Sequence, residues 1–250
     1  MSLDKNYIKE TLTMLGRKYG MRETFEDFVY CCAYSISNLT NFNENREQEY
    51  LSISKKYKKE EFNLFAEMLS ALTLELNKDD CEDVLGNIFE ELGLHDKGRG
   101  QFFTPLHVSK FMAQITFDKE NIQKEINEKG YITVADECCG SGRMLFAYLS
   151  LLKENNMDIN NVYFVGADIS NLCCCMTYVN LSLRGASATI NHQDTLLLKQ
   201  YGYYITPGLF LNKNLVNKLI DSGYLEIKKE TESKQNNELE NSEEEIDIER

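Results

Sequence analysis

The stretch that decides the fold is YITVADECCGSGRMLFAYLSLLKEN (131–155). Its first six residues are a short run rich in β-formers, ECCGSG is a turn, and the residues from Arg143 onward have helical spacing. NVYFVGAD (161–168) and SATINHQD (187–194) predict two more strands, and the helical ISNLCCCMTYVNLSLRG lies between them. Strands that alternate with helices predict an α/β fold with a parallel, doubly wound sheet. A ligand crevice is then expected at the carboxyl ends of the strands.

Acidic and glycine residues gather at those predicted strand ends. Asp136, Asp168 and Asp194 each close a strand, and Gly140 and Gly142 allow a tight turn that a ligand can approach closely. The helix that follows the turn offers free N–H groups and a partial positive charge. Asp168 is placed to accept both hydroxyls of a ribose, and Asp194 to meet an adenine amino group. The alternative is that these aspartates cap helices and that the glycines make an ordinary structural turn.

The turn differs from the usual nucleotide-binding fingerprints. G-x-G-x-x-G is absent, Arg143 follows the second glycine, and there is no Walker lysine motif. S-adenosylmethionine is the remaining common ligand of such a crevice.

Upstream lies GRGQFFTPLHVSKFMAQI (98–115), in which two phenylalanines and a Thr-Pro precede a run with helical spacing. Gly98 and Gly100 give the loop freedom to fold over a crevice, and Pro105 is expected to start the helix with its φ already set. This arrangement is suited to holding a flat ligand. The alternative is an aromatic packing contact ahead of an ordinary helix.

The residues before this loop have helical periodicity. ETFEDFVYCCAYSISNL, EEFNLFAEMLSALTLEL and DDCEDVLGNIFEELGL each repeat apolar positions at helical spacing, the last with Asp79 or Asp80 as its expected cap. The predicted organisation is a helical domain over 1–97, a cofactor-binding domain over 98–228 and an acidic disordered tail over 229–250.

Composition narrows the function further. The 250 residues carry a net charge of −13, so a partner or a local basic patch would be needed to hold DNA. No apolar run reaches the about 20 residues that cross a bilayer, and the first residues lack the apolar core of a signal peptide, so a cytoplasmic protein without membrane contact is expected. The eight cysteines include adjacent pairs but no C-x-x-C, which favours small, reduced, buried residues over a metal site or a disulfide framework.

Five elements in order, DVLGNIFEELGL, GQFFTP, VADECCGSGRML, GADIS and HQDTL, resemble the N-6 adenine DNA methylase family. The similarity covers roughly residues 80–197 and is closest to modification (M) subunits of type I restriction-modification systems. It implies a Rossmann-like, S-adenosylmethionine-dependent methyltransferase fold with a helical amino-terminal domain, and a restriction-type protein partner. The cofactor-binding residues it implies are Gln101, Phe102, Phe103, Thr104, Pro105, Asp136, Gly140, Ser141, Gly142, Asp168 and Asp194. Phe102 or Phe103 would shield the adenosine from water.

One element of the family pattern is missing. Amino-methylating DNA enzymes place Asn, Asp or Ser before Pro-Pro and an aromatic, which aim the adenine amine and stack on the flipped base. The two prolines of this chain are Pro105 and Pro207, so Thr206, Pro207 and Phe210 are its nearest catalytic candidates. A plain turn after an edge strand is the alternative. The sheet is expected to be truncated, with no target-recognition domain after it.

Three functions therefore remain open. The chain is an adenine-specific DNA methyltransferase completed by another chain, a cofactor-binding pseudo-methyltransferase acting as an accessory or regulatory subunit, or a methyltransferase on a non-DNA substrate.

Overall fold

The computed structural model of the chain describes residues 3–78, 81–94, 103–227 and 248–249. Its amino-terminal part is helical, as the periodicity predicts. The helices are α1 (Lys5–Tyr19), α2 (Met21–Asn38), α3 (Glu44–Ser54), α4 (Lys59–Leu76) and α5 (Val84–Glu91). The cap of α5 is Asp83, whose side chain accepts a hydrogen bond from Gly86 N, rather than Asp79 or Asp80, which lie outside the described residues.

The strands form a mixed sheet in the order β1-β2-β3-β4. The first three strands are parallel and lie within one residue of the predicted ranges, whereas the fourth is antiparallel to β3. The strands are β1 (Ile132–Asp136), β2 (Val162–Asp168), β3 (Ala188–Asp194) and β4 (Lys199–Ile205). An α/β fold with a mostly parallel sheet is therefore confirmed.

The strand order does not reverse within the described residues, so their sheet lacks the switch point of a doubly wound fold. The reason is the connection between β3 and β4, which consists only of residues 195–198. A parallel crossover needs a dozen or more residues, so the chain turns back as a hairpin beside β3 instead of crossing to β1. As a result β1 and β4 are the two edges of this sheet.

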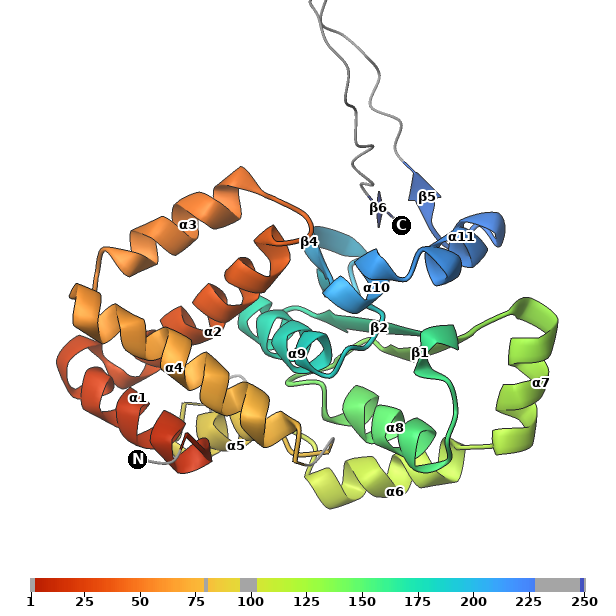
Figure 1. The fold of residues 1–250 in the computed structure, drawn as a ribbon, viewed down its shortest axis with the longest axis horizontal. Coiled ribbons are helices and arrows are strands. Elements are labelled where there is room, and N and C mark those ends of the chain that lie inside the picture. The colour runs from red at the N-terminus through yellow and green to blue at the C-terminus, as the bar shows by residue number, and fades with distance from the viewer. Residues whose placement is uncertain (1–2, 79–80, 95–102, 228–247, 250) are drawn as a thin grey trace, which may run out of the picture.

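Helices cover both faces of the sheet (Figure 1). The helices α8 and α9 pack with the amino-terminal helices on one face, where Phe164, Ala188 and Ile190 are buried. The helices α10 and α11 cover the other face over Tyr163 and Val165. The helices after α5 are α6 (Leu106–Thr116), α7 (Lys119–Lys129), α8 (Arg143–Glu154), η2 (Ile159–Asn161), α9 (Asn171–Leu183), α10 (Pro207–Leu211) and α11 (Lys213–Asp221).

The amino-terminal helices and the sheet share one hydrophobic core. Phe25 and Phe28 of α2 belong to the same buried cluster as Phe146 of α8 and Tyr178 of α9. All eight cysteines are free and seven of them are buried, as the sequence predicts; Cys138 is exposed. Burial raises the pKa of the Cys139 and Cys174 thiols, so these residues behave as small apolar side chains.

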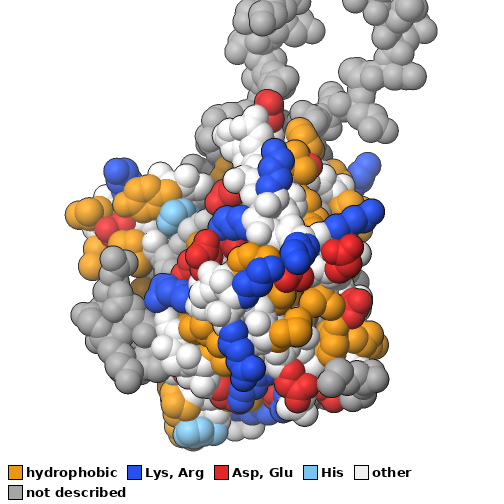
Figure 2. Space-filling model, turned by 90° about the vertical axis from the view of Figure 1, so that its left-hand side faces the viewer, with side chains coloured by type: hydrophobic (Ala, Val, Ile, Leu, Met, Phe, Trp, Pro, Cys, Tyr) orange, Lys and Arg blue, Asp and Glu red, His pale blue; other side chains and the backbone are white. Residues whose placement is uncertain are grey.

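The solvent face of the helical part is charged but internally paired. Figure 2 shows Lys and Arg side chains running down this face with acidic side chains beside them. Lys9 pairs with Glu91, Lys18 with Glu61, and Lys56 with both Glu23 and Asp27. Such pairing leaves less positive charge for a phosphate backbone than the number of basic side chains suggests.

Most of the expected tail, residues 229–247 and 250, lies outside the described residues. Within it, Ile248–Glu249 form the short strand β6, which pairs antiparallel with β5 (Glu226–Ile227). Among the described residues, no helix combines the length and apolarity needed to cross a membrane.

Candidate cofactor-binding site

The turn after β1 has the backbone geometry that its glycines permit. Gly140 has φ +55° and Gly142 has φ +94°, both in the region that L-residues avoid. The N–H of Gly140 donates to Asp168 Oδ2 at 2.9 Å, and that of Gly142 donates to Cys139 O at 2.8 Å. The turn is therefore fastened to the end of β2, the neighbouring strand.

Side chains from two further segments, α9 and the residue before α5, also hold this turn. Thr177 Oγ1 donates to Gly140 O at 2.9 Å, and Asn180 Nδ2 donates to Ser141 O at 2.9 Å. Ser141 Oγ donates to Asp83 Oδ2 at 2.6 Å. Sequence reasoning missed Asp83, Thr177 and Asn180, although Thr177 and Asn180 are polar residues in an otherwise apolar, buried helix. Buried polar groups need partners, which is the signal that could have found them.

Helix α8 begins beside the turn without a side-chain cap. Its N-cap is Gly142, whereas Ser170 caps the next helix, α9, by accepting from Cys173 N. The first N–H groups of an uncapped helix are available to an external acceptor. A carboxylate or another anionic group of a ligand fits this position.

Asp168 accepts hydrogen bonds through both carboxylate oxygens. Besides Gly140 N, it accepts from Ser170 N at 2.8 Å. An ionised carboxylate offers about four lone-pair positions, so two remain for the hydroxyls of a ligand. Asp168 thus holds the Gly turn and keeps acceptor positions that these two bonds do not use.

Asp136 lies next to further negative charge. Burial raises its pKa, the N–H of Cys138 at 3.0 Å opposes this, and the charges of Glu137 and Asp168 raise it again. A cationic ligand would relieve this repulsion, whereas an anion at the same place would increase it.

Asp194 stands apart from this pair in its hydrogen bonding. Its Oδ1 accepts from Leu196 N at 3.0 Å and Leu197 N at 2.9 Å, so it caps the turn to β4. Its predicted contact with adenine stays a prediction.

The segment before α6 lies against the Gly turn. A Cβ on Gly140 would come within 3.0 Å of Phe103 Cδ1, so the phenylalanine ring rests directly on this backbone. Thr104 and Pro105 are exposed. Pro105 is the N-cap residue of α6, with φ −55° and ψ 138°, so it precedes the first helical residue instead of occupying it. Gln101 and Phe102 lie outside the described residues.

The structure does not bring the catalytic candidates to this edge. Thr206 follows an antiparallel strand, so it lies where β3 begins, with Oγ1 donating to Ala186 O at 2.7 Å and accepting from Ala188 N at 2.8 Å. Ala188 and Asp194 are the first and last residues of the seven-residue strand β3, so six steps of about 3.3 Å, roughly 20 Å, separate them. Pro207 is the first residue of α10 and Phe210 lies within this short helix, at the same end of the sheet. These contacts are typical of a plain turn after an edge strand, which is the alternative interpretation of this segment.

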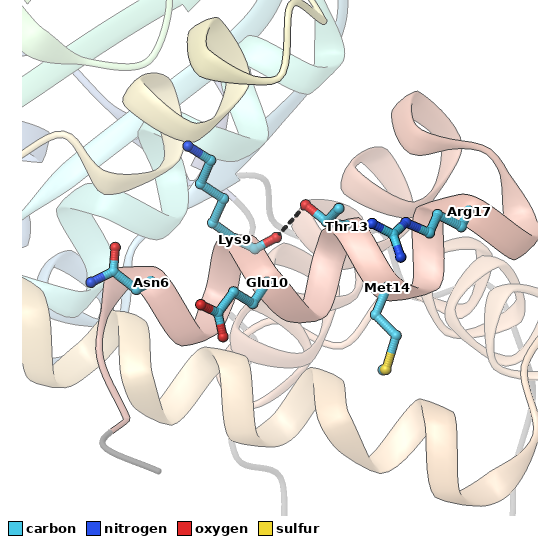
Figure 3. Close-up of a pocket in the computed structure, with 6 residues that line it drawn as sticks. All are labelled: Asn6, Lys9, Glu10, Thr13, Met14 and Arg17. Atoms are coloured by element: carbon cyan, nitrogen blue, oxygen red, sulfur yellow. Dashed lines mark hydrogen bonds between the residues drawn. The ribbon is translucent and has the colours of Figure 1, made fainter.

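A surface groove elsewhere does not involve the predicted residues. It has a volume of about 400 Å³ and lies along the solvent side of α1, lined by Asn6, Lys9, Glu10, Thr13, Met14 and Arg17 (Figure 3). Thr13 Oγ1 donates to Lys9 O at 2.7 Å, a hydrogen bond within α1 itself. The groove contains none of the residues of the Gly turn.

A Gly turn and acidic residues at the carboxyl ends of parallel strands are typical of α/β proteins that bind nucleoside-containing cofactors. Comparison with known proteins narrows this class. Residues 79–243 match the N-6 DNA Methylase family, and the chain belongs to that family. Proteins of this family use S-adenosylmethionine. Membership of the family implies a Rossmann-like methyltransferase fold.

Two characterised relatives are distantly similar. The chain is 29% identical over 119 residues to the type I restriction enzyme MjaIX methylase subunit of Methanocaldococcus jannaschii, covering 46% of this chain and 19% of that protein. It is 32% identical over 97 residues to the type II methyltransferase M.MamI of Microbacterium ammoniaphilum, covering 37% of this chain and 26% of that protein. The matched part therefore spans only about a fifth of the first relative and about a quarter of the second.

Proposed function

We propose that this chain binds S-adenosylmethionine at the Gly140–Gly142 turn and Asp168, as the cofactor-binding part of an N-6 adenine DNA methyltransferase. The strongest support is the hydrogen bonding of Asp168. Its Oδ2 accepts from Gly140 N in the Gly turn, and the carboxylate still has lone-pair positions that can accept from a ligand. Family membership supplies the cofactor class.

The side chains present fit the chemical groups of this cofactor. The carboxylates of Asp136 and Asp168 lie close enough for the charge of one to raise the pKa of the other, which suits the positive sulfonium and ammonium groups. The uncapped start of α8 suits the cofactor's carboxylate. When bound, S-adenosylmethionine supplies an electrophilic methyl group.

We further propose that this chain alone does not methylate adenine at a useful rate. The whole sequence has no Pro-Pro, and its closest candidates lie at the opposite end of β3 from Asp194. Losing one oriented polar group typically lowers a rate by about 10²–10³. Methylation of DNA then requires a partner chain, as the type I relative's description as a subunit suggests. An accessory role without catalysis and a non-DNA substrate are the competing functions.

Calorimetry with S-adenosylhomocysteine tests the cofactor proposal. We expect the wild type to bind and Asp168→Ala to bind about 10–100-fold more weakly, the scale of lost hydrogen bonds to a charged group. Asp158→Ala is the matched control, because Asp158 caps η2, close to where β2 begins, and is exposed. No binding by the wild type at millimolar ligand, or equal loss in both variants, would contradict the proposal.

A methyl-transfer assay with labelled cofactor separates the competing functions. We expect no transfer to unmethylated or hemimethylated DNA by the chain alone, and transfer once a partner from the same genome neighbourhood is added. Transfer by the chain alone that is lost in the Thr206→Ala, Phe210→Ala double variant, with cofactor binding retained, would instead make this turn catalytic.

A further inference from the structure

A buried charged cluster joins the amino-terminal helices to the Gly turn. At its centre is Asp83, which has no exposed surface and accepts from Arg143 Nε at 2.5 Å and from Ser141 Oγ at 2.6 Å. The charges of Asp83 and Glu90 outweigh the effect of burial and raise the pKa of Arg143.

Arg143 itself contacts four separate groups. It is 5% exposed, and its guanidinium donates to Thr104 O at 3.2 Å, to Asn87 Oδ1 at 2.9 Å and to Glu90 Oε2 at 2.8 Å. The planar guanidinium has five N–H donors in a fixed geometry, so one side chain can serve all these acceptors together with Asp83.

The same side chain reaches the aromatic ring that covers the turn. The Arg143 guanidinium carbon lies 5.4 Å from the centre of the Phe103 ring, and this ring is also 5.5 Å from Phe89. Phe103 in turn rests on Gly140. Arg143 is the first residue of α8, immediately after Gly142. It therefore fixes the turn through its backbone and the overlying segment through its side chain.

From these contacts we infer that Arg143, anchored by Asp83, is a positioning residue that holds residues 103–105 against the Gly140–Gly142 turn and thereby sets the affinity for cofactor. The inference rests on the proposed function, because it needs a ligand at this turn. Binding is tighter when the segments that surround a ligand are already in place, since less conformational entropy is lost on association.

A second buried arginine allows a matched comparison. Arg184 is 6% exposed, donates to Glu82 O at 2.6 Å and to Asn180 O at 2.9 Å, and lies over the Phe146 ring. It also joins the segment before α5 to α9, but at the carboxyl end of that helix. Arg143→Lys and Arg184→Lys remove the same guanidinium and keep the same charge, so a purely structural role predicts the same outcome for both.

The experiment measures two quantities for the wild type and both variants: Tm without ligand, and Kd for S-adenosylhomocysteine by calorimetry. We expect both variants to lower Tm and only Arg143→Lys to weaken Kd, by about tenfold, the scale of one lost charged hydrogen bond. Hydrogen exchange at residues 103–106 of the free protein should also accelerate in Arg143→Lys alone.

Each outcome separates the two proposals. If the wild type binds and Arg143→Lys has the same Kd, the positioning role is overturned and the proposed function stands. The same conclusion follows if Arg184→Lys weakens binding as much as Arg143→Lys does. Absence of wild-type binding overturns the proposed function and the positioning role with it. If Arg143→Lys does not fold, Phe103→Leu replaces it, because leucine keeps an apolar contact with Phe89 but removes the ring; an unchanged Kd in that variant overturns the inference.

Discussion

Two strand-to-helix turns of this protein contain the residue types of a binding site, and they differ in whether a side chain caps the helix that follows. In the Thr206 turn between β4 and α10, the buried hydroxyl donates to Ala186 O, accepts from Ala188 N at the start of β3, and caps α10 by accepting from Leu209 N. The Gly140 turn between β1 and α8 is held by side chains of α9, β2 and the residue before α5, while its own helix start lacks a side-chain cap.

The difference teaches that a turn whose helix start has no side-chain cap can present its backbone N–H groups to a ligand, whereas a turn whose own Thr hydroxyl caps the helix has already satisfied one of them.

The largest effect is expected from Asp83→Ala. This change removes the buried carboxylate that pairs with Arg143, so that only the partly exposed Glu90 remains, and it leaves Ser141 Oγ without its acceptor. Breaking a buried ion pair costs about 3–5 kcal/mol of unfolding free energy, which urea titration measures. Asp4→Ala, which removes the N-cap at the start of α1, is the comparison and should cost about 0.5–2 kcal/mol. Equal losses in the two variants would show that the turn is not anchored through Asp83.

Thr206→Val should destabilise the protein without affecting the cofactor site. The change removes a fully buried hydroxyl and leaves Ala188 N and Ala186 O unpaired, at a cost of about 1–3 kcal/mol. Thr206→Ser keeps the hydroxyl and should lose less. The Kd for S-adenosylhomocysteine should stay within about twofold of the wild type in both variants. A loss of affinity in Thr206→Val but not in Thr206→Ser would mean that the Thr206 turn is coupled to the ligand site.

Gly140→Ala and Gly185→Ala separate backbone strain from the site itself. Gly140 has φ +55° and Gly185 has φ +71°, so alanine is strained at both positions, by about 1–2 kcal/mol. An added Cβ meets Phe103 at Gly140, whereas it meets nothing within 4 Å at Gly185. We therefore expect comparable losses of Tm, with weaker cofactor binding only in Gly140→Ala. Unchanged binding in that variant would show that the ligand does not approach this backbone.

The smallest effect concerns pH. Burial and the neighbouring Glu137 and Asp168 raise the pKa of Asp136 above its unfolded value, so folding favours the protonated carboxyl. The unfolding free energy of the wild type, relative to that of Asp136→Asn, should therefore fall as the pH rises through the folded pKa. Below about pH 3.9 the carboxyl is protonated in both the folded and the unfolded state, so this pH-dependent part of the difference should vanish. Asparagine keeps an acceptor for Cys138 N. Thermal melts between pH 3.5 and 7.5 measure the difference, and a constant difference over about that whole range would contradict the shift.

Helix α6 shows how far periodicity alone can be followed. Val108, Phe111, Met112 and Ile115 have helical spacing, and a helix forms over Leu106–Thr116, yet these four side chains are exposed. The buried residues are Ser109 and Ala113. Ala113 packs with Cys81 and with Ala147 of α8. Periodicity identifies a helix because it reflects the backbone repeat, but it does not say which face a neighbour covers, and small residues here allow close packing with α8.

The sequence by itself determined the first three strands, the Gly turn and the acidic residues that close the strands. These features are local: apolar β-rich runs form strands, only glycine readily adopts the positive φ of the turn, and strand ends follow from the next polar residue. It also determined the family, through five short elements in a fixed order.

Only the tertiary structure decided which residues support that turn and where the second turn lies. Asp83 meets Arg143 across 60 positions of the chain, and Thr177 and Asn180 reach the turn from a different helix. Such contacts depend on how whole elements pack, which no local pattern encodes. The place of Thr206 follows from the direction of β4, and that direction was fixed by the short 195–198 connection, which can close a hairpin but cannot span a crossover.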